Sequence, residues 1–146
     1  PDEHLVGYCL FSVATQYYAA RDYLKNTPPH LYQWITNTHS GDKPEWIKRT
    51  PFPDAKVGPC ISDLTLRHQA ANLGHGLIRG ACYIAHNFDN LVSLAGTKPE
   101  PFQQIWVLSH PDLAHIDRIQ VLKKYLTDAL KSKKARITGE GEAVNV

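Results

Sequence analysis

Eight histidines and three cysteines are the residues of this chain with the widest range of possible chemistry. Helical zinc sites commonly use two histidines at positions i and i+4, and many zinc sites use a Cys-x-x-Cys pair. Neither His68 with His75 nor His110 with His115 has this spacing, and the sequence contains no Cys-x-x-Cys. The sequence therefore implies no metal site and no cofactor. We expect the histidines on the surface or in loops, with His110 fixing a turn.

The cysteines permit a second kind of chemistry. Cys9, Cys60 and Cys82 are widely spaced, and each lies in an apolar stretch, as buried free thiols commonly do. Free thiols favour a reducing, cytoplasmic location. If Cys60 or Cys82 met a distant histidine, the chain would be a small cysteine-dependent hydrolase. No nucleophile elbow or oxyanion-hole signature supports this alternative function. A disulfide between two of the cysteines also stays open.

Charge and glycine patterns narrow the possible partners. Gly74-His75-Gly76 has neither the spacing nor the lysine of a phosphate-binding loop. A net charge of +2 over 146 residues implies neither nucleic acid nor an anionic membrane as a direct partner. No apolar run has the length needed to cross a bilayer. A short basic run near the end of the chain is best placed at a helix C-terminus, where cations offset the dipole; its residues are Lys131, Lys133, Lys134 and Arg136.

Apolar and polar segments alternate along the chain and predict an α/β domain with a largely parallel sheet. The segment 104–108 is rich in aliphatic and β-branched residues, so we expect a strand buried on both faces. Asp63 is the expected N-cap of a helix that ends before Gly74. The expected domain covers 1–136, followed by a flexible tail over 137–146. The expected strands are 5–11, 31–36, 46–47, 57–62, 77–79, 91–94 and 104–108, and the expected helices are 15–25, 63–73, 81–86 and 116–130.

Several of these segments resemble a known family. They are the glycine turn Gly74-His75-Gly76-Leu77, the strand Leu91-Val92-Ser93-Leu94, and Ile105-Trp106-Val107-Leu108-Ser109-His110-Pro111-Asp112-Leu113 with Arg118. Tyr18-Ala19-Ala20 with Tyr23-Leu24 adds to the pattern. In this order and spacing they resemble the C-terminal part of the effector-sensing domain of LysR-type transcriptional regulators. The resemblance covers nearly the whole chain. It departs at Gly80-Ala81, where the family commonly places proline.

The resemblance implies both an architecture and a function. The chain would be the second lobe of a two-lobed, periplasmic-binding-protein-like (type 2) effector domain, with the strand and closing helix that return to the first lobe. It would not be an enzyme. A small effector would bind between the lobes and regulate transcription by changing the domain's conformation. DNA would be bound only by a winged helix-turn-helix domain that this sequence lacks. Because the sequence starts at Pro1 and not at Met, we expect a fragment or a processed chain, and the resemblance implies a C-terminal sensing fragment of a longer regulator.

The resemblance also implies where the effector binds. In such proteins the ligand lies at strand ends and helix N-termini, where free N–H groups and the positive end of the helix dipole favour an anion. Alternatively, Ser62 and Asp63 only cap a helix and residues 36–38 only shape a turn. The implied effector-binding residues are Thr36, Asn37 and Thr38 after the second strand, and Ser62, Leu64 and Thr65 at the start of the following helix.

The closing helix carries an apolar stripe at three- and four-residue spacing, which places its members on one face. In the family, this helix packs on the first lobe, which the chain mostly lacks. Soluble monomers rarely expose such a stripe, so we expect self-association through it. The expected oligomerisation residues are Ile116, Ile119, Leu122, Tyr125 and Leu126.

Overall fold

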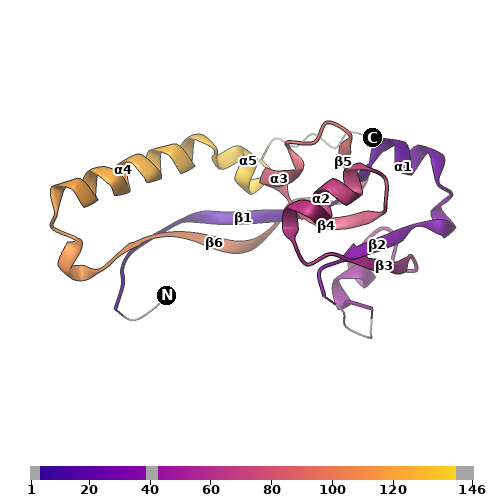
Figure 1. Cartoon of the computed structure of the whole chain (residues 1–146), viewed down its shortest axis with the longest axis horizontal. Coiled ribbons are helices and arrows are strands. Elements are labelled where there is room, and N and C mark those ends of the chain that lie inside the picture. Colours follow the sequence, from indigo (N-terminus) through magenta and orange to yellow (C-terminus); the bar gives the residue numbers. More distant parts are fainter. Residues whose placement is uncertain (1–3, 39–42, 141–146) are drawn as a thin grey trace.

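The computed structural model of the chain describes residues 4–38 and 43–140 and has the expected α/β fold. One sheet has the order β3-β2-β4-β1-β5, and β6 pairs with β1 (Figure 1). Its strands are β1 (Val6–Ala20), β2 (Gln33–Thr36), β3 (Lys56–Cys60), β4 (Leu77–Ala81), β5 (Leu91–Ser93) and β6 (Glu100–Ser109). The helices are α1 (Arg21–Asn26), α2 (Leu64–Asn72), α3 (Cys82–Ala85), α4 (Asp117–Ser132) and α5 (Lys134–Thr138), with short 3-10 turns at Pro29–Leu31, Glu45–Arg49 and Pro111–Leu113.

The sheet is mixed, so the expectation of a largely parallel sheet was wrong. β2 runs parallel to β3 and β4, whereas β1 runs antiparallel to β4, β5 and β6. The reason is that β1 enters the lobe from outside and lies in the middle of the sheet. The three parallel strands still end at one edge of the sheet, which is where the resemblance placed the ligand.

β1 also corrects the helix expected over 15–25. The strand continues to Ala20, and only Arg21–Asn26 is helical. Residues 14–20 are all buried, on both faces of the strand. Such an uninterrupted buried run is typical of a central strand, not of a helix with one solvent face. Aromatic side chains at Tyr17 and Tyr18 and the small Ala19 and Ala20 are compatible with that position.

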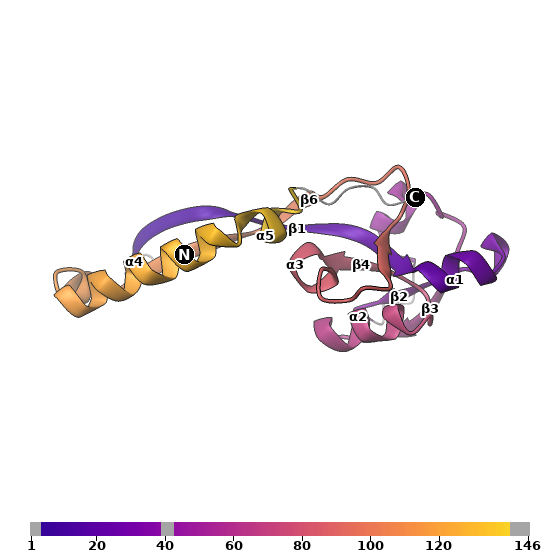
Figure 2. The same cartoon turned by 90° about the horizontal axis from the view of Figure 1, so that it is seen from above.

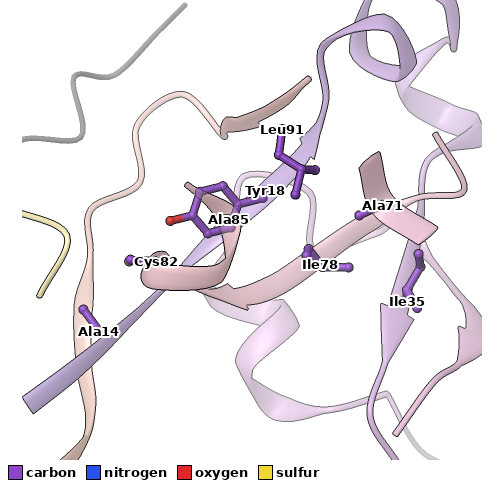
Figure 3. Packing of buried hydrophobic residues seen from close by; sticks show 8 residues of the cluster. All are labelled: Ala14, Tyr18, Ile35, Ala71, Ile78, Cys82, Ala85 and Leu91. Carbon is purple, nitrogen blue, oxygen red and sulfur yellow. The ribbon is translucent and has the colours of Figure 1, made fainter. Parts of the chain in front are cut away.

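The two faces of the sheet are covered differently. One face packs against α2 and α3 through a cluster that includes Tyr18, Ile35, Ile78 and Cys82 (Figure 3). The other face is covered by aromatic residues from the loops and α1, in a cluster around Trp34. Trp46 belongs to that cover, where its ring stacks on Tyr17 at 5.9 Å between centroids and meets Trp34 edge-on at 5.1 Å.

The expectation of a short strand at 46–47 was wrong. These residues lie in the 3-10 helix Glu45–Arg49, which follows Pro44. An ion pair of 2.6 Å joins Glu45 to Lys48, at the i, i+3 spacing that a helical turn brings together.

β1 and β6 leave the lobe together as a two-stranded ribbon, and α4 runs beside it (Figures 1 and 2). The ribbon is largely exposed, so the expectation that 104–108 is buried on both faces was wrong; Val107 alone in that run is buried. Apolar composition matched a covered strand, but nothing in the described part of the chain covers the ribbon's other face.

α4 is joined to the ribbon by a few polar contacts. The hydroxyl groups of Tyr8 and Thr127 are 2.7 Å apart, and the Lys123 ammonium donates to Ser109 Oγ at 3.2 Å. Beyond α4, the domain boundary expected after Arg136 falls inside α5, where Ile137 is buried. Residues 141–146 of the expected tail lie outside the described residues.

Candidate functional site

The carboxyl ends of β2, β3 and β4 meet at one edge of the sheet. Thr36, Cys60 and Ala81 are the last residues of these strands, and α2 begins at the same edge. Asp63 is the N-cap of α2, as expected, because its side chain accepts a hydrogen bond of 2.7 Å from the N–H of Leu66. In α/β sheets, ligands commonly bind outside the carboxyl ends of parallel strands. This edge is therefore the first place to look for a binding site.

A cavity of about 370 Å³ opens at this edge. Its size is within the usual range for small-molecule sites. Apolar side chains from several elements form much of its wall, and two arginines are the only charged residues among the described ones that line it. It is lined by Val13, Thr15, Ile35, Asn37, Trp46, Leu64, Arg67, Arg79, Ala81, Tyr83, Phe102 and Gln103.

Two of the six expected effector-binding residues, Asn37 and Leu64, line this cavity. Thr36 is buried, and its hydroxyl donates to the carbonyl of Thr38 at 3.3 Å, so both take part in the turn after β2. Ser62 and Thr65 are exposed and lie outside the lining. The carbonyl of Ser62 instead accepts from Arg67 at 3.4 Å.

Arg67 is a lining residue that the sequence did not single out. It is 8% exposed on α2, and one of its terminal nitrogens donates to the carbonyl of Ile61 at 2.8 Å. This contact holds the loop between β3 and α2. Burial lowers the pKa of Arg67, and the nearby Asp63 and Cys60 partly offset that effect. A guanidinium nevertheless keeps its charge in proteins. In the described part of the chain, no carboxylate forms an ion pair with Arg67.

Arg79 is the second cation of the cavity, and it lies on β4. Its Nε donates to Thr15 Oγ1 on β1 at 3.3 Å, and its guanidinium lies 5.1 Å from the centroid of the Phe102 ring. β1 pairs Val13 with Gln103 and Ala14 with Pro101, so Phe102 is an extra residue opposite this step. Such a bulge redirects a side chain. Neither the bulge nor the pairing of β4 with β1 could be read from local sequence.

The residues of the other hypotheses are dispersed. Cys9 is exposed in the ribbon, contrary to the expectation of buried thiols, whereas Cys60 is half-buried and Cys82 is buried. In the described part of the chain, none of the three forms a disulfide. His68 is buried, which corrects the expectation that histidines lie on the surface. His110 accepts from the N–H of Asp112 at 3.4 Å and so fixes its turn, as expected.

Within residues 4–38 and 43–140, no group of three or more His, Cys, Asp or Glu side chains could hold a metal ion. No helix there is both long and apolar enough to cross a membrane.

Solved structures place this geometry among known folds. The regulatory domain of CrgA, a LysR-type transcriptional regulator from Neisseria meningitidis, matches with a TM-score of 0.59 and 21% identity, over 88% of this chain and 70% of that one. The effector domain of AmpR from Pseudomonas aeruginosa matches with a TM-score of 0.61 and 10% identity, over 92% and 70%. No family model and no curated protein matches the sequence.

A full-length relative shows how much of such a regulator the chain spans. LysG from Corynebacterium glutamicum, solved with its bound effector Arg, matches with a TM-score of 0.62 and 12% identity. The match covers 90% of this chain and 47% of LysG. The chain therefore has the fold of a LysR-type effector-binding domain, and the periplasmic-binding-protein-like (type 2) architecture expected from the sequence is confirmed. That the chain corresponds to the second lobe stays a prediction.

Proposed function

We propose that this chain is part of the effector-sensing domain of a LysR-type transcriptional regulator and is not an enzyme. The observation that carries the proposal is the fold, which solved regulatory domains of this class share over about nine-tenths of the chain. LysG, one of these regulators, was solved with an effector bound. A ligand bound more tightly by one conformation of the domain would shift its population, and the whole regulator would transmit that shift to DNA. The three cysteines, none of which forms a disulfide in the described part of the chain, support a cytoplasmic location.

The proposed effector site is the cavity at the carboxyl ends of the parallel strands. Three features support it: the position of the cavity on the sheet, its volume, and the presence of Asn37 and Leu64 in its wall. The two arginines favour an effector that carries negative charge. The proposed self-association surface is the outer face of α4, where Leu122 is 50% exposed and Tyr125 is 69% exposed.

The test is a thermal-shift screen of the chain against a library of small metabolites, followed by calorimetry of each hit. We expect at least one compound to bind the wild type and Asn37→Ala to weaken that binding, because Asn37 lines the cavity. Thr65→Val is the matched control, since Thr65 is exposed at the start of α2 but outside the lining. Equal binding by Asn37→Ala would contradict the site. Hydrolytic turnover that Cys60→Ser abolished would overturn the proposed function itself.

A further inference from the structure

The cavity has two chemically different sides. Arg67 and Arg79 supply charge, whereas Val13, Ile35 and Phe102 supply apolar surface. Within residues 4–38 and 43–140, no Asp or Glu lines the cavity. In residues 4–38 and 43–140, neither arginine takes part in an ion pair. A partly buried cation without a carboxylate partner leaves unused hydrogen-bonding capacity and favours an anion beside it.

Both arginines have donors to spare. A guanidinium carries five N–H donors. Arg67 uses one terminal nitrogen for the carbonyl groups of Ile61 and Ser62. Arg79 uses Nε for Thr15. The structure describes no hydrogen bond from the other terminal nitrogen of Arg67 or from either terminal nitrogen of Arg79. These contacts hold each guanidinium in place, so little side-chain freedom would be lost when a ligand binds.

Phe102 joins the charged side of the cavity to the apolar one. Its ring lies beside the Arg79 guanidinium and is 56% exposed, although it lines the cavity. An aromatic body placed against Phe102 would bury this apolar surface. A carboxylate attached to that body would then lie on the side of Arg79. An inorganic anion would satisfy the arginines but leave the apolar wall uncovered.

We infer that the effector of the proposed sensor is a small amphipathic organic acid, with its carboxylate between Arg67 and Arg79 and its apolar or aromatic body against Phe102. This inference rests on the proposed function, because it specifies the ligand of that same cavity. The Arg79 side chain recognises the charge through bidentate, charge-assisted hydrogen bonds. Phe102 selects the shape and polarity of the rest of the molecule.

The experiment compares four probes by calorimetry: phenylacetate, its uncharged analogue phenylacetamide, acetate and inorganic phosphate. We expect phenylacetate to bind at least about tenfold more tightly than phenylacetamide, since loss of a charge-assisted pair costs about that factor or more. Acetate and phosphate should bind more weakly than phenylacetate because neither covers the apolar wall. Equal binding of phenylacetate and phenylacetamide, or tighter binding of phosphate, would overturn the inference, and so would the absence of phenylacetate binding.

Variants of the two sides complete the test. Arg79→Gln should remove the preference for phenylacetate over phenylacetamide, and Arg79→Lys should restore only part of it, since lysine lacks the planar fork. Phe102→Ala should weaken the binding of phenylacetate but leave the binding of acetate unchanged. A thermal melt of each variant verifies that it folds. Arg67→Lys applies the same comparison of phenylacetate with phenylacetamide to the arginine on α2. An unchanged preference in folded Arg79→Gln would overturn the inference. If the metabolite screen instead yields an uncharged ligand that Asn37→Ala weakens, the proposed function stands and this inference fails.

Discussion

The imidazole of His68 lies fully buried between α2 and β4. Its Nδ1 is 2.7 Å from the carbonyl of Leu64, and its ring stacks on Phe88 with 6.4 Å between centroids. The Nε2 atom is buried and has no hydrogen-bond partner in the described part of the chain. Burial lowers the pKa of His68, and the neighbouring Arg67 lowers it further, while the backbone groups of Leu64 and Ala81 oppose both effects. The neutral ring is therefore the form that the fold holds.

This burial predicts a pH dependence of stability. The pKa of His68 is lower in the folded chain than its value of about 6.5 in the unfolded chain. The unfolded chain therefore binds the proton first. The contribution of His68 is complete above the unfolded-state pKa and is lost as the pH falls from there through the lower pKa of the folded chain. Urea unfolding should show a lower free energy at about pH 5.5 than at about pH 7.5. His68→Gln should reduce that difference, whereas His86→Gln, at an exposed site, should not. An equal pH dependence in His68→Gln would contradict this account.

Gly80 makes room for the same ring. A Cβ atom at Gly80 would lie 2.5 Å from His68 Nε2 and 3.1 Å from atoms of Ile78 and Tyr18. The departure from the family pattern at Gly80-Ala81 thus accompanies a buried histidine against β4. Gly80→Ala should destabilise the chain by about 1–3 kcal/mol, because the core has no space for the methyl group. The free energy of urea unfolding measures this.

The control for Gly80→Ala is Gly58→Ala on β3. There the nearest atoms belong to the side chain of Gln33, at 2.7 Å, and that flexible side chain can move aside. A loss of stability as large in Gly58→Ala as in Gly80→Ala would show that the effect comes from replacing a strand glycine and not from contact with His68.

At the scale of the elements, local signals located most of the fold. Asp63 and Gly74 bounded α2, and Gly74 has the positive φ of 82° that a helix-ending glycine commonly adopts. These signals lie within a few residues of the feature they specify. Asn37 and Leu64, the two expected residues that line the cavity, could be predicted for the same reason. Each lies directly after a strand end or a helix cap.

The elements that were missed depend on distant parts of the chain. Ala19 and Ala20 are compatible with a helix locally, but the pairing of β1 with β4 and β5 fixes them as strand. Likewise, nothing in the local sequence distinguishes Arg67 and Arg79 from other polar residues of a helix and a strand. They line one cavity only because β4 lies beside β1 and α2 begins at the same sheet edge. The spacing of these residues in the sequence does not predict that they lie close together.

The whole molecule has a compact lobe and a projecting arm, formed by the ribbon and α4 (Figure 2). In the arm, the members of the apolar stripe expected on α4 differ in their exposure. Ile116 and Ile119 are half-buried, whereas Leu122, Tyr125 and Leu126 are exposed. On the ribbon, Trp106 pairs with Cys9, on the face opposite Tyr8 and therefore away from α4, and is 41% exposed. The arm thus presents large apolar side chains on two sides.

The ribbon also has unpaired strand edges. Over its first half, β1 is paired with β6 alone, and β6 pairs only with β1 in the described part of the chain. Edges of this kind are templates for a further strand. Exposed apolar residues and open edges together make the arm, and not the lobe, the region where we expect a second copy of this chain to bind.

We therefore predict that the isolated chain self-associates through the arm, as sedimentation over a range of concentrations would measure. Burial of each large side chain contributes roughly 1.5–3 kcal/mol. Leu122→Asp with Leu126→Asp should yield a monomer, because an interface containing α4 would then bury two carboxylates without partners. Leu73→Asp is the matched control, since Leu73 is 73% exposed at the end of α2, on the lobe. A wild-type chain that sediments as a monomer at high concentration would exclude self-association. A variant with Leu73→Asp that dissociates as much as the α4 variant would place the interface outside the arm.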